Sequence, residues 1–293
     1  MLSSCAAHFS GMERLGKFPN WRDLSPILLV SDYSGEHPKS KYDVYTFVVT
    51  TLSTWQRLDP TRRQWRERHL TGRGALSFKG LGDSQRFGSL QSFLDQIVWR
   101  LPSLVFTVAI AKGHGPLFDS LPEESLALER WKPSVRERML RVLHFASMLV
   151  AGFTRPRQDA MWFTDQDKLA SNSGQLTALT ELVANATTHL ASANFGHLKV
   201  GTTASDNGSF ELEDLASVAD LTAGAVCEML NSGLSTQLVG PLVVPAPSQV
   251  SHKTKLIAAS FQRRDSASRH AFMVLEDSVN SVKWLKFHHR YGG

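Results

Sequence analysis

The chain has 293 residues, of which 42% are hydrophobic and 20% are charged, a composition that excludes a disordered protein and supports one large or two modest globular domains. The two cysteines have no metal-ligand spacing around them, so we expect reduced thiols in an intracellular, cytoplasmic protein. The longest apolar runs stay near ten residues, against roughly 20 for a bilayer span, so we expect neither secretion nor membrane insertion.

Residues 1–24 show no clear period and are interpreted as a loosely attached N-terminal arm. The first regular element follows at 27–30, where four consecutive aliphatic residues are typical of a buried strand. This strand should end where Asp32 enters a Ser-Gly turn, and a second strand over 42–51 should pair with it as a hairpin. A carboxylate at the end of a buried strand either closes the turn or belongs to a polar site, and Asp32 taken alone is explained by the turn.

Residues 57–86 carry eight basic side chains against three acidic ones, whereas residues 159–228 carry ten acids against two lysines. The formal net charge of +5 favours acidic partners only weakly, but this segregation is more informative. Glycines interrupt the basic segment and predict an exposed ribbon or loop there. Basic residues interleaved with aromatic ones suit phosphates and stacked bases, although a solvated basic face explains the pattern equally well. The candidate nucleic-acid-binding residues are Arg57, Arg62, Arg63, Arg66, Arg68, Arg73, Lys79 and Arg86.

The middle of the chain alternates helices and strands. Apolar residues at helical spacing predict a helix over 89–100, and an apolar run predicts a buried strand over 104–111. A helical insertion is expected at about 117–155, with its main helix beginning at Pro133. His144 lies in the apolar stripe of that helix and is interpreted as a hydrogen-bonded core histidine.

The chain then continues with a short strand over 160–164 that runs into Asp165. A helix over 175–190, a short strand over 198–203 and a well-defined helix over 211–230 follow, each indicated by its apolar spacing.

Residues 233–293 are expected to form a C-terminal extension. A segment rich in proline and valine at 239–250 is interpreted as a linker or edge segment. It precedes a helix over 251–263 and a terminal hairpin of 270–275 with 282–287.

The helix that carries Asp220 has one face of small residues, because steps of three and four place Ser217, Asp220 and Gly224 together and allow a close approach to the sheet. An aspartate in mid-helix is unfavourable and needs a partner, which an arginine could supply. Glu213 and Asp214 lie in the first turn, where the helix dipole favours acids, so they are interpreted as structural.

Three acids follow in chain order: Asp32 and Asp165, each at the end of a predicted buried strand, and Asp220 within an otherwise apolar helix. Carboxylates gathered together repel one another unless they are protonated or bridged by cations, and oxygen ligands select Mg²⁺ or Mn²⁺ over zinc. Such a cluster could hold one or two metal ions that hydrolyse a phosphodiester. Considered singly, Asp165 and Asp167 are better explained as capping or turn acids than as catalytic residues.

Three short motifs carry a resemblance to a known family: Asp32-Tyr33-Ser34-Gly35 after a hydrophobic strand, Trp162-Phe163-Thr164-Asp165 in mid-chain, and Ala219-Asp220-Leu221-Thr222-Ala223-Gly224 in a late helix. They resemble the motifs of the domain-of-unknown-function 3800 family, whose members are similar to ribonuclease H. The resemblance implies an α/β fold over 25–232, a ribonuclease H-like mixed β-sheet flanked by helices. It also implies a metal-dependent, nuclease-like site on the three aspartates.

One departure from the family pattern concerns the first motif, because Tyr33 replaces the usual glutamate and removes a carboxylate. Glu36 or Asp167 could substitute as a metal ligand only if the turn geometry permits. The sequence therefore predicts a nuclease that hydrolyses DNA or RNA with Mg²⁺ or Mn²⁺. The alternative is a catalytically weak or inactive ribonuclease H-like subunit that binds nucleic acid or a protein partner.

Overall fold

The chain is described here by a computed structural model that covers residues 21, 24, 26–72, 74–117, 126–165, 169–191, 195–232, 250–261, 263, 265–275 and 282–285. It forms two compact units, each built from three separate segments. Unit 1 comprises Met1–Val30, Val49–Thr54 and Pro116–Leu212, and unit 2 comprises Ser31–Val48, Trp55–Gly115 and Glu213–Gly293. The predicted N-terminal arm at 1–24 lies almost wholly outside the described residues.

The strands form a mixed sheet, so the α/β class is confirmed. They are β1 (Ile27–Ser34), β2 (Tyr42–Thr51), β3 (Ser103–Ala111), β4 (Ala160–Thr164), β5 (Leu198–Thr202), β6 (Ser268–Leu275) and β7 (Val282–Leu285). Their hydrogen-bonded order is β5-β4-β1-β2-β3-β6-β7. The pairs β4/β5 and β3/β6 are parallel, whereas β6/β7 is antiparallel. The first two strands belong partly to each unit, because the unit boundaries fall inside them.

Most helices occur where the apolar spacing predicts them. They are α2 (Leu52–His69), α3 (Ser84–Phe93), α4 (Pro133–Phe153), α5 (Ser173–Leu190), α6 (Glu211–Asn231) and α7 (His252–Phe261). A 3₁₀ turn, η1 (Lys79–Gly82), precedes α3, and a π-helical turn (Leu94–Val98) follows it. Within the part of the chain that the structure describes, no helix is long and apolar enough to cross a membrane.

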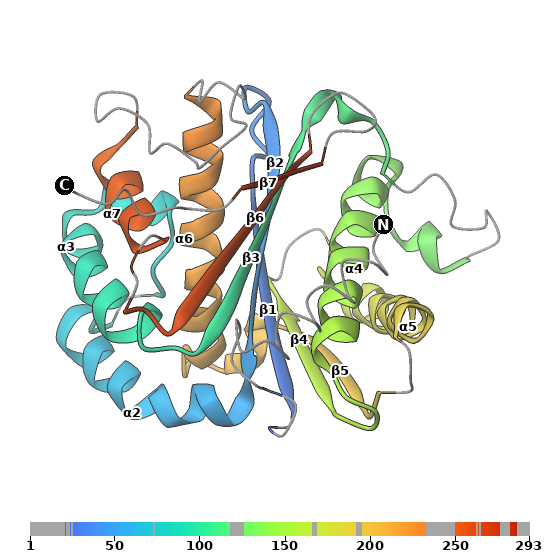
Figure 1. The fold of residues 1–293 in the computed structure, drawn as a ribbon, viewed down its shortest axis with the longest axis horizontal. Coiled ribbons are helices and arrows are strands. Elements are labelled where there is room, and N and C mark those ends of the chain that lie inside the picture. Colours follow the sequence, from blue (N-terminus) through green and yellow to red (C-terminus); the bar gives the residue numbers. More distant parts are fainter. Residues whose placement is uncertain are drawn as a thin grey trace. The chain divides into compact units, whose positions relative to one another are not determined.

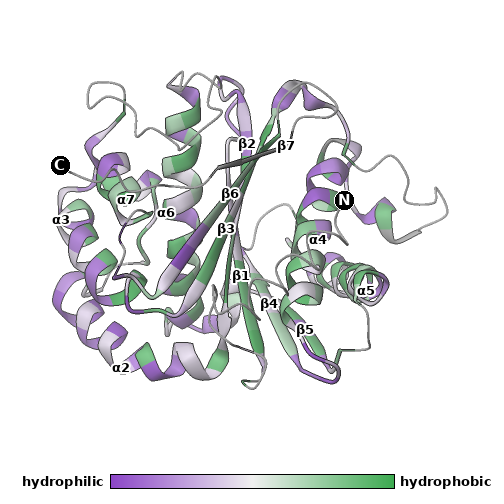
Figure 2. Ribbon diagram, viewed as in Figure 1, coloured by the Kyte–Doolittle hydropathy of each residue, from purple (hydrophilic) through white to green (hydrophobic). Residues whose placement is uncertain are grey.

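One prediction is wrong: the basic segment begins as the 18-residue helix α2 and not as a ribbon or loop. The glycines that suggested a break all lie beyond residue 71, so they act only after this helix has ended. Trp55 and Trp65 are both almost fully buried and anchor the helix. Figure 2 shows the rest of α2 as largely hydrophilic. The few apolar residues of its buried face therefore give only a weak helical pattern in the sequence.

In unit 2, the C-terminal residues add strands to β3. Ser103 lies opposite Ser268, and Ser103 Oγ donates a hydrogen bond of 3.0 Å to Ser268 Oγ. The predicted terminal hairpin is confirmed by β6 and β7, while the predicted linker at 239–250 lies outside the described residues except at its last position. Helices α2, α3, α6 and α7 lie on one face of these strands (Figure 1).

In unit 1, α4 packs against α5, which contacts β5. His144 confirms its predicted structural role, because its Nδ1–H donates to the Leu140 carbonyl at 2.7 Å and burial lowers the pKa of the imidazole. Trp21 is buried with its ring 5.2 Å from that of Phe153, and Gln158 donates a hydrogen bond to the Trp21 carbonyl. The chain just before β1 is therefore anchored at this point.

His270 on β6 is an unusual polar residue in unit 2. Its ring lies between Phe261, at 4.7 Å, and Phe272, at 6.1 Å, and neither ring nitrogen has a hydrogen-bond partner among the described residues. Burial, with a smaller contribution from the Arg269 charge, lowers the pKa of His270 to about 3.

We predict that the protein becomes less stable as the pH is lowered, because His270 is buried in its neutral form. The unfolded chain takes up a proton near the ordinary pKa of 6.5, whereas the folded chain does so only near a pKa of about 3. At about pH 5.5 this difference costs about 1.4 kcal/mol relative to pH 8. Urea unfolding at several pH values measures the effect, and a His270→Phe variant should lose this part of the pH dependence. An unchanged pH slope in the variant would contradict the prediction.

Candidate functional site

The three candidate aspartates lie at different depths. Asp32 lies on β1 and Asp220 lies midway along α6, both half-buried and both in unit 2. Asp165 follows β4 in unit 1 and is exposed, and its Oδ1 accepts a 3.4 Å hydrogen bond from Thr203. Of the two substitute ligands considered, Glu36 is exposed, and Asp167 lies outside the described residues.

Asp32 lies within its strand and not at its end, because β1 continues for two residues to Ser34. Its Oδ1 accepts the backbone N–H of Tyr33 at 2.5 Å. The turn comes at Gly35, whose φ of 98° and tight approach to the Tyr42 carbonyl exclude a side chain. The turn therefore depends on the glycine, and Asp32 is held before it.

Tyr33, the departure from the family pattern, is directed away from Asp32. Its hydroxyl and Ser31 Oγ form a 2.7 Å hydrogen bond, and its ring centroid lies 5.8 Å from that of Tyr45. Successive side chains of a strand point to opposite faces, so the phenol and the Asp32 carboxylate lie on different faces of β1. Tyr33 is a packing residue that occupies the face opposite the candidate site.

One identified partner of Asp220 is a backbone group. Its Oδ2 accepts a short hydrogen bond from the N–H of Phe78, in the segment that leads into η1. The carbonyl of the same phenylalanine accepts a 2.7 Å hydrogen bond from the ammonium group of Lys253 on α7. The Lys253 Nζ also lies 3.9 Å from the centre of the Phe78 ring. One residue thus joins an acid of α6 to a cation of α7.

The small-residue face of α6 receives the segment before η1. Ser217 Oγ donates to the Leu76 carbonyl at 2.7 Å, one turn before Asp220. One turn after Asp220, the ring of Phe78 lies so close to Gly224 that a Cβ there would overlap it. The sequence predicts that this face approaches the sheet, whereas the contacts at Ser217 and Gly224 are made by residues 76–78.

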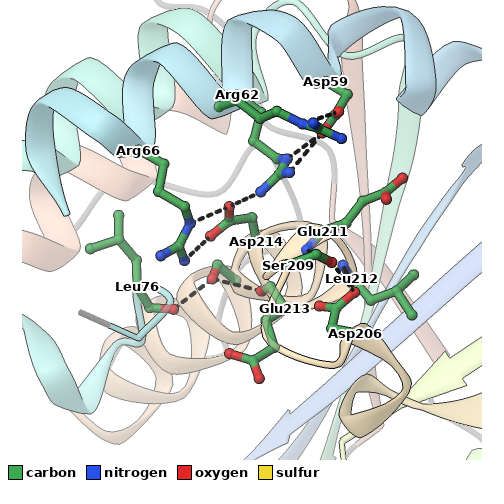
Figure 3. Close-up of polar contacts among 12 residues, drawn as sticks. Asp59, Arg62, Arg66, Leu76, Asp206, Ser209, Glu211, Leu212, Glu213 and Asp214 are labelled. Carbon is green, nitrogen blue, oxygen red and sulfur yellow. Dashed lines mark hydrogen bonds and ion pairs between the residues drawn. The ribbon is translucent and has the colours of Figure 1, made fainter. Parts of the chain in front are cut away.

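Asp214 on α6 is the centre of an ion-pair network with α2 (Figure 3). It is 1% exposed, and Arg66 binds it in a bidentate manner, with Nε 3.0 Å from Oδ2 and Nη2 2.8 Å from Oδ1. Arg62 donates to Asp214 at 2.8 Å and to Asp59 at 2.7 Å. Burial lowers the pKa of Arg62, but these carboxylates outweigh it and raise the pKa above its ordinary value, so the guanidinium stays charged.

This network changes the set of candidate nucleic-acid-binding residues. Arg62 is 1% exposed and Arg66 is 12% exposed, so an exposed phosphate-binding role is wrong for Arg62 and the charge of Arg66 is already paired. Arg63 is 66% exposed although it pairs with Asp59 at 2.6 Å. The remaining members divide by burial: Arg57, Arg68 and Lys79 are exposed, Arg86 is half-buried, and Arg73 lies outside the described residues.

The donor chemistry of Asp32 and Asp220 suits Mg²⁺ or Mn²⁺, because both offer carboxylate oxygens at half-buried positions of one unit. Among the residues that the structure describes, no group of three or more histidine, cysteine, aspartate or glutamate side chains is placed to hold a metal ion. The two aspartates therefore fit such an ion by the chemistry of their oxygen atoms.

Comparisons with known proteins leave the site to be judged on its own geometry. No family model matches the sequence, and no curated protein matches it closely enough to show a relationship.

We predict that Asp214→Asn destabilises the protein by about 3–5 kcal/mol, because it leaves buried arginine charge without its carboxylate. Urea unfolding measures the loss. Asp265→Asn is the matched control: this carboxylate also pairs with an arginine, Arg263, but is 68% exposed, so its loss should be much smaller. Equal effects of the two substitutions would contradict the buried network.

A second substitution tests the packing of Phe78 on α6. Gly224→Ala should cost about 1–3 kcal/mol, because the added methyl group overlaps the Phe78 ring. Gly88→Ala is the control: Gly88 lies in α3 with open space around its Cβ position, so alanine should stabilise the protein by about 0.5–1 kcal/mol. Thermal unfolding compares them, and a stabilising Gly224→Ala would exclude the close contact.

Proposed function

We propose that the chain is a divalent-metal-dependent nuclease with a ribonuclease H-like fold, which uses Asp32, Asp165 and Asp220 to hydrolyse the phosphodiester bonds of DNA or RNA. The observation that carries the proposal is the pair of half-buried carboxylates in unit 2, Asp32 held by the N–H of Tyr33 and Asp220 by the N–H of Phe78. Fixing a carboxylate with a backbone donor stabilises its charged form, as metal binding requires. Bound Mg²⁺ or Mn²⁺ would lower the pKa of water and stabilise charge on the leaving oxygen.

The residues around the aspartates supply the remaining parts of the proposal. The exposed cations Arg57, Arg63 and Arg68 lie on α2, where they would attract a phosphate backbone. Asp165 is exposed in unit 1 and belongs to the proposal through its position in the second motif of the resemblance.

A second candidate is a ribonuclease H-like subunit that binds nucleic acid, with or without a protein partner, and does not cleave it. The specific observation in its favour is the hydrogen bond from Phe78 to Asp220, which gives this mid-helix acid a structural role. Under this alternative, Asp220 holds residues 76–78 on α6.

The proposal predicts that cleavage of labelled RNA, single-stranded DNA and duplex DNA requires Mg²⁺ or Mn²⁺ and stops with a chelator. Asp32→Asn and Asp220→Asn should each reduce the cleavage rate by roughly 100-fold, because the neutral amide binds a cation poorly. Asparagine can still accept the Phe78 N–H, so the fold should survive, and circular dichroism checks this.

Asp95→Asn is the control, because Asp95 is an exposed acid of the same unit, paired with Arg263 at 3.4 Å. It should cleave at the rate of the unaltered protein. Metal-dependent cleavage that persists in the Asp32→Asn, Asp220→Asn double variant would overturn the nuclease proposal. Nucleic-acid binding without turnover would instead select the second candidate.

A further inference from the structure

Lys253 is a half-buried lysine on α7 whose charge has no carboxylate partner among the described residues. Its ammonium group donates one hydrogen bond, to the Phe78 carbonyl at 2.7 Å, and lies over the ring of the same residue. An ammonium group has three donors, so two remain for a ligand. Partial burial of a cation is costly unless it has a partner, and an anion would supply one.

The neighbouring segment presents a second cation of this kind. The guanidinium of Arg86 lies against Gly80, where a Cβ would come within 2.8 Å of Nη1 and 2.7 Å of Ser77 Oγ. Its Nε is buried and has no hydrogen-bond partner among the described residues. Glycine at position 80 is therefore what lets the guanidinium lie on the backbone of η1. Lys79, between the two contact points, is exposed and carries a third positive charge.

The three cations gather around four consecutive residues, 77–80. Lys253 contacts Phe78 and Arg86 contacts Gly80, and the Cα atoms of these two residues lie at most about 7.6 Å apart, because each peptide spans 3.8 Å. The backbone N–H of Phe78 also donates a hydrogen bond to the Asp220 carboxylate. Cations that have no acidic partner among the described residues thus lie close to a candidate catalytic acid.

The start of α7 is fixed, so Lys253 is not a mobile surface lysine. Glu228 of α6 accepts the Ser251 N–H at 2.5 Å and the Ser251 hydroxyl at 2.9 Å. The His252 ring lies 5.4 Å from the Phe87 ring, which follows Arg86 in α3. These contacts hold α7, α6 and α3 around the 77–80 segment and preorganise its charges.

We infer that Lys253, Arg86 and Lys79 form a phosphate-binding site for the backbone of a single-stranded nucleic acid beside Asp220. The inference deepens the proposed function, on whose nucleic-acid substrate it rests. Lys253 and Arg86 each bind a non-bridging phosphate oxygen, and the phosphodiester is thereby placed next to the Asp220 carboxylate. Lys253 comes from the C-terminal extension, which is thus part of the site and not an accessory.

The test measures binding of fluorescein-labelled single-stranded DNA and RNA of about 20 nucleotides by anisotropy, in chelator so that nothing is cleaved. Lys253→Gln should weaken binding by about 10- to 100-fold, the loss of one charge-assisted hydrogen bond. It should also reduce the slope of log K against log salt concentration by about 0.7, the value for one single-strand phosphate contact. Arg86→Gln should act in the same direction, and Lys253→Arg should retain most of the affinity.

Lys255→Gln is the matched control, because it removes the same charge from the same helix, two residues along and on another face. Its affinity and salt slope should equal those of the unaltered protein. If the Lys253→Gln variant binds with unchanged affinity and an unchanged salt slope, the inference is overturned. It is also overturned if the protein binds neither oligonucleotide but binds inorganic phosphate in a way that depends on Lys253. The binding assay involves no metal and no turnover. A negative result in it therefore concerns the phosphate-binding site alone, and the cleavage assay tests the nuclease proposal separately.

Discussion

The buried charge of Asp214 is the constraint on which the rest of unit 2 depends. A carboxylate that is 1% exposed is tolerated only because two arginines of α2 enclose it, and this requirement fixes α2 against the first turns of α6. From that anchor, α6 presents Ser217, Asp220 and Gly224 to the segment that follows α2. The ion pairs near the helix start therefore determine which residues come to lie beside Asp220.

The regular elements were predictable wherever a single period explains the residues. The strands β1 and β3 appear as continuous apolar runs because they are buried along almost their whole length, and α4 and α6 show apolar residues at helical spacing. The prediction of a ribbon or loop for the basic segment was wrong for a different reason. Its helix is stabilised by charges of α6 about 150 residues away, as with Arg62 and Asp214, and no local pattern contains that pairing.

The candidate site was predictable in its acids but not in their surroundings. The sequence indicates that Asp220 needs a partner, but one partner that the structure identifies is the backbone N–H of Phe78, which no side-chain pattern predicts. Asp214 looked like an ordinary acid of a first helical turn, and only its burial shows that it binds arginines. Lys253 carried no signal at all, because its importance depends on contacts made across 175 positions of the chain.

The route of the chain through β1 and β2 has a consequence for dissection of the protein. Each unit contains part of both strands and is assembled from three segments, so no single cut separates the chain into the two units. Because unit boundaries fall inside β1 and β2, a cut at one of these boundaries interrupts a strand. A fragment intended to hold one unit alone would therefore have to include residues of the other, because the segments of the two units alternate along the chain.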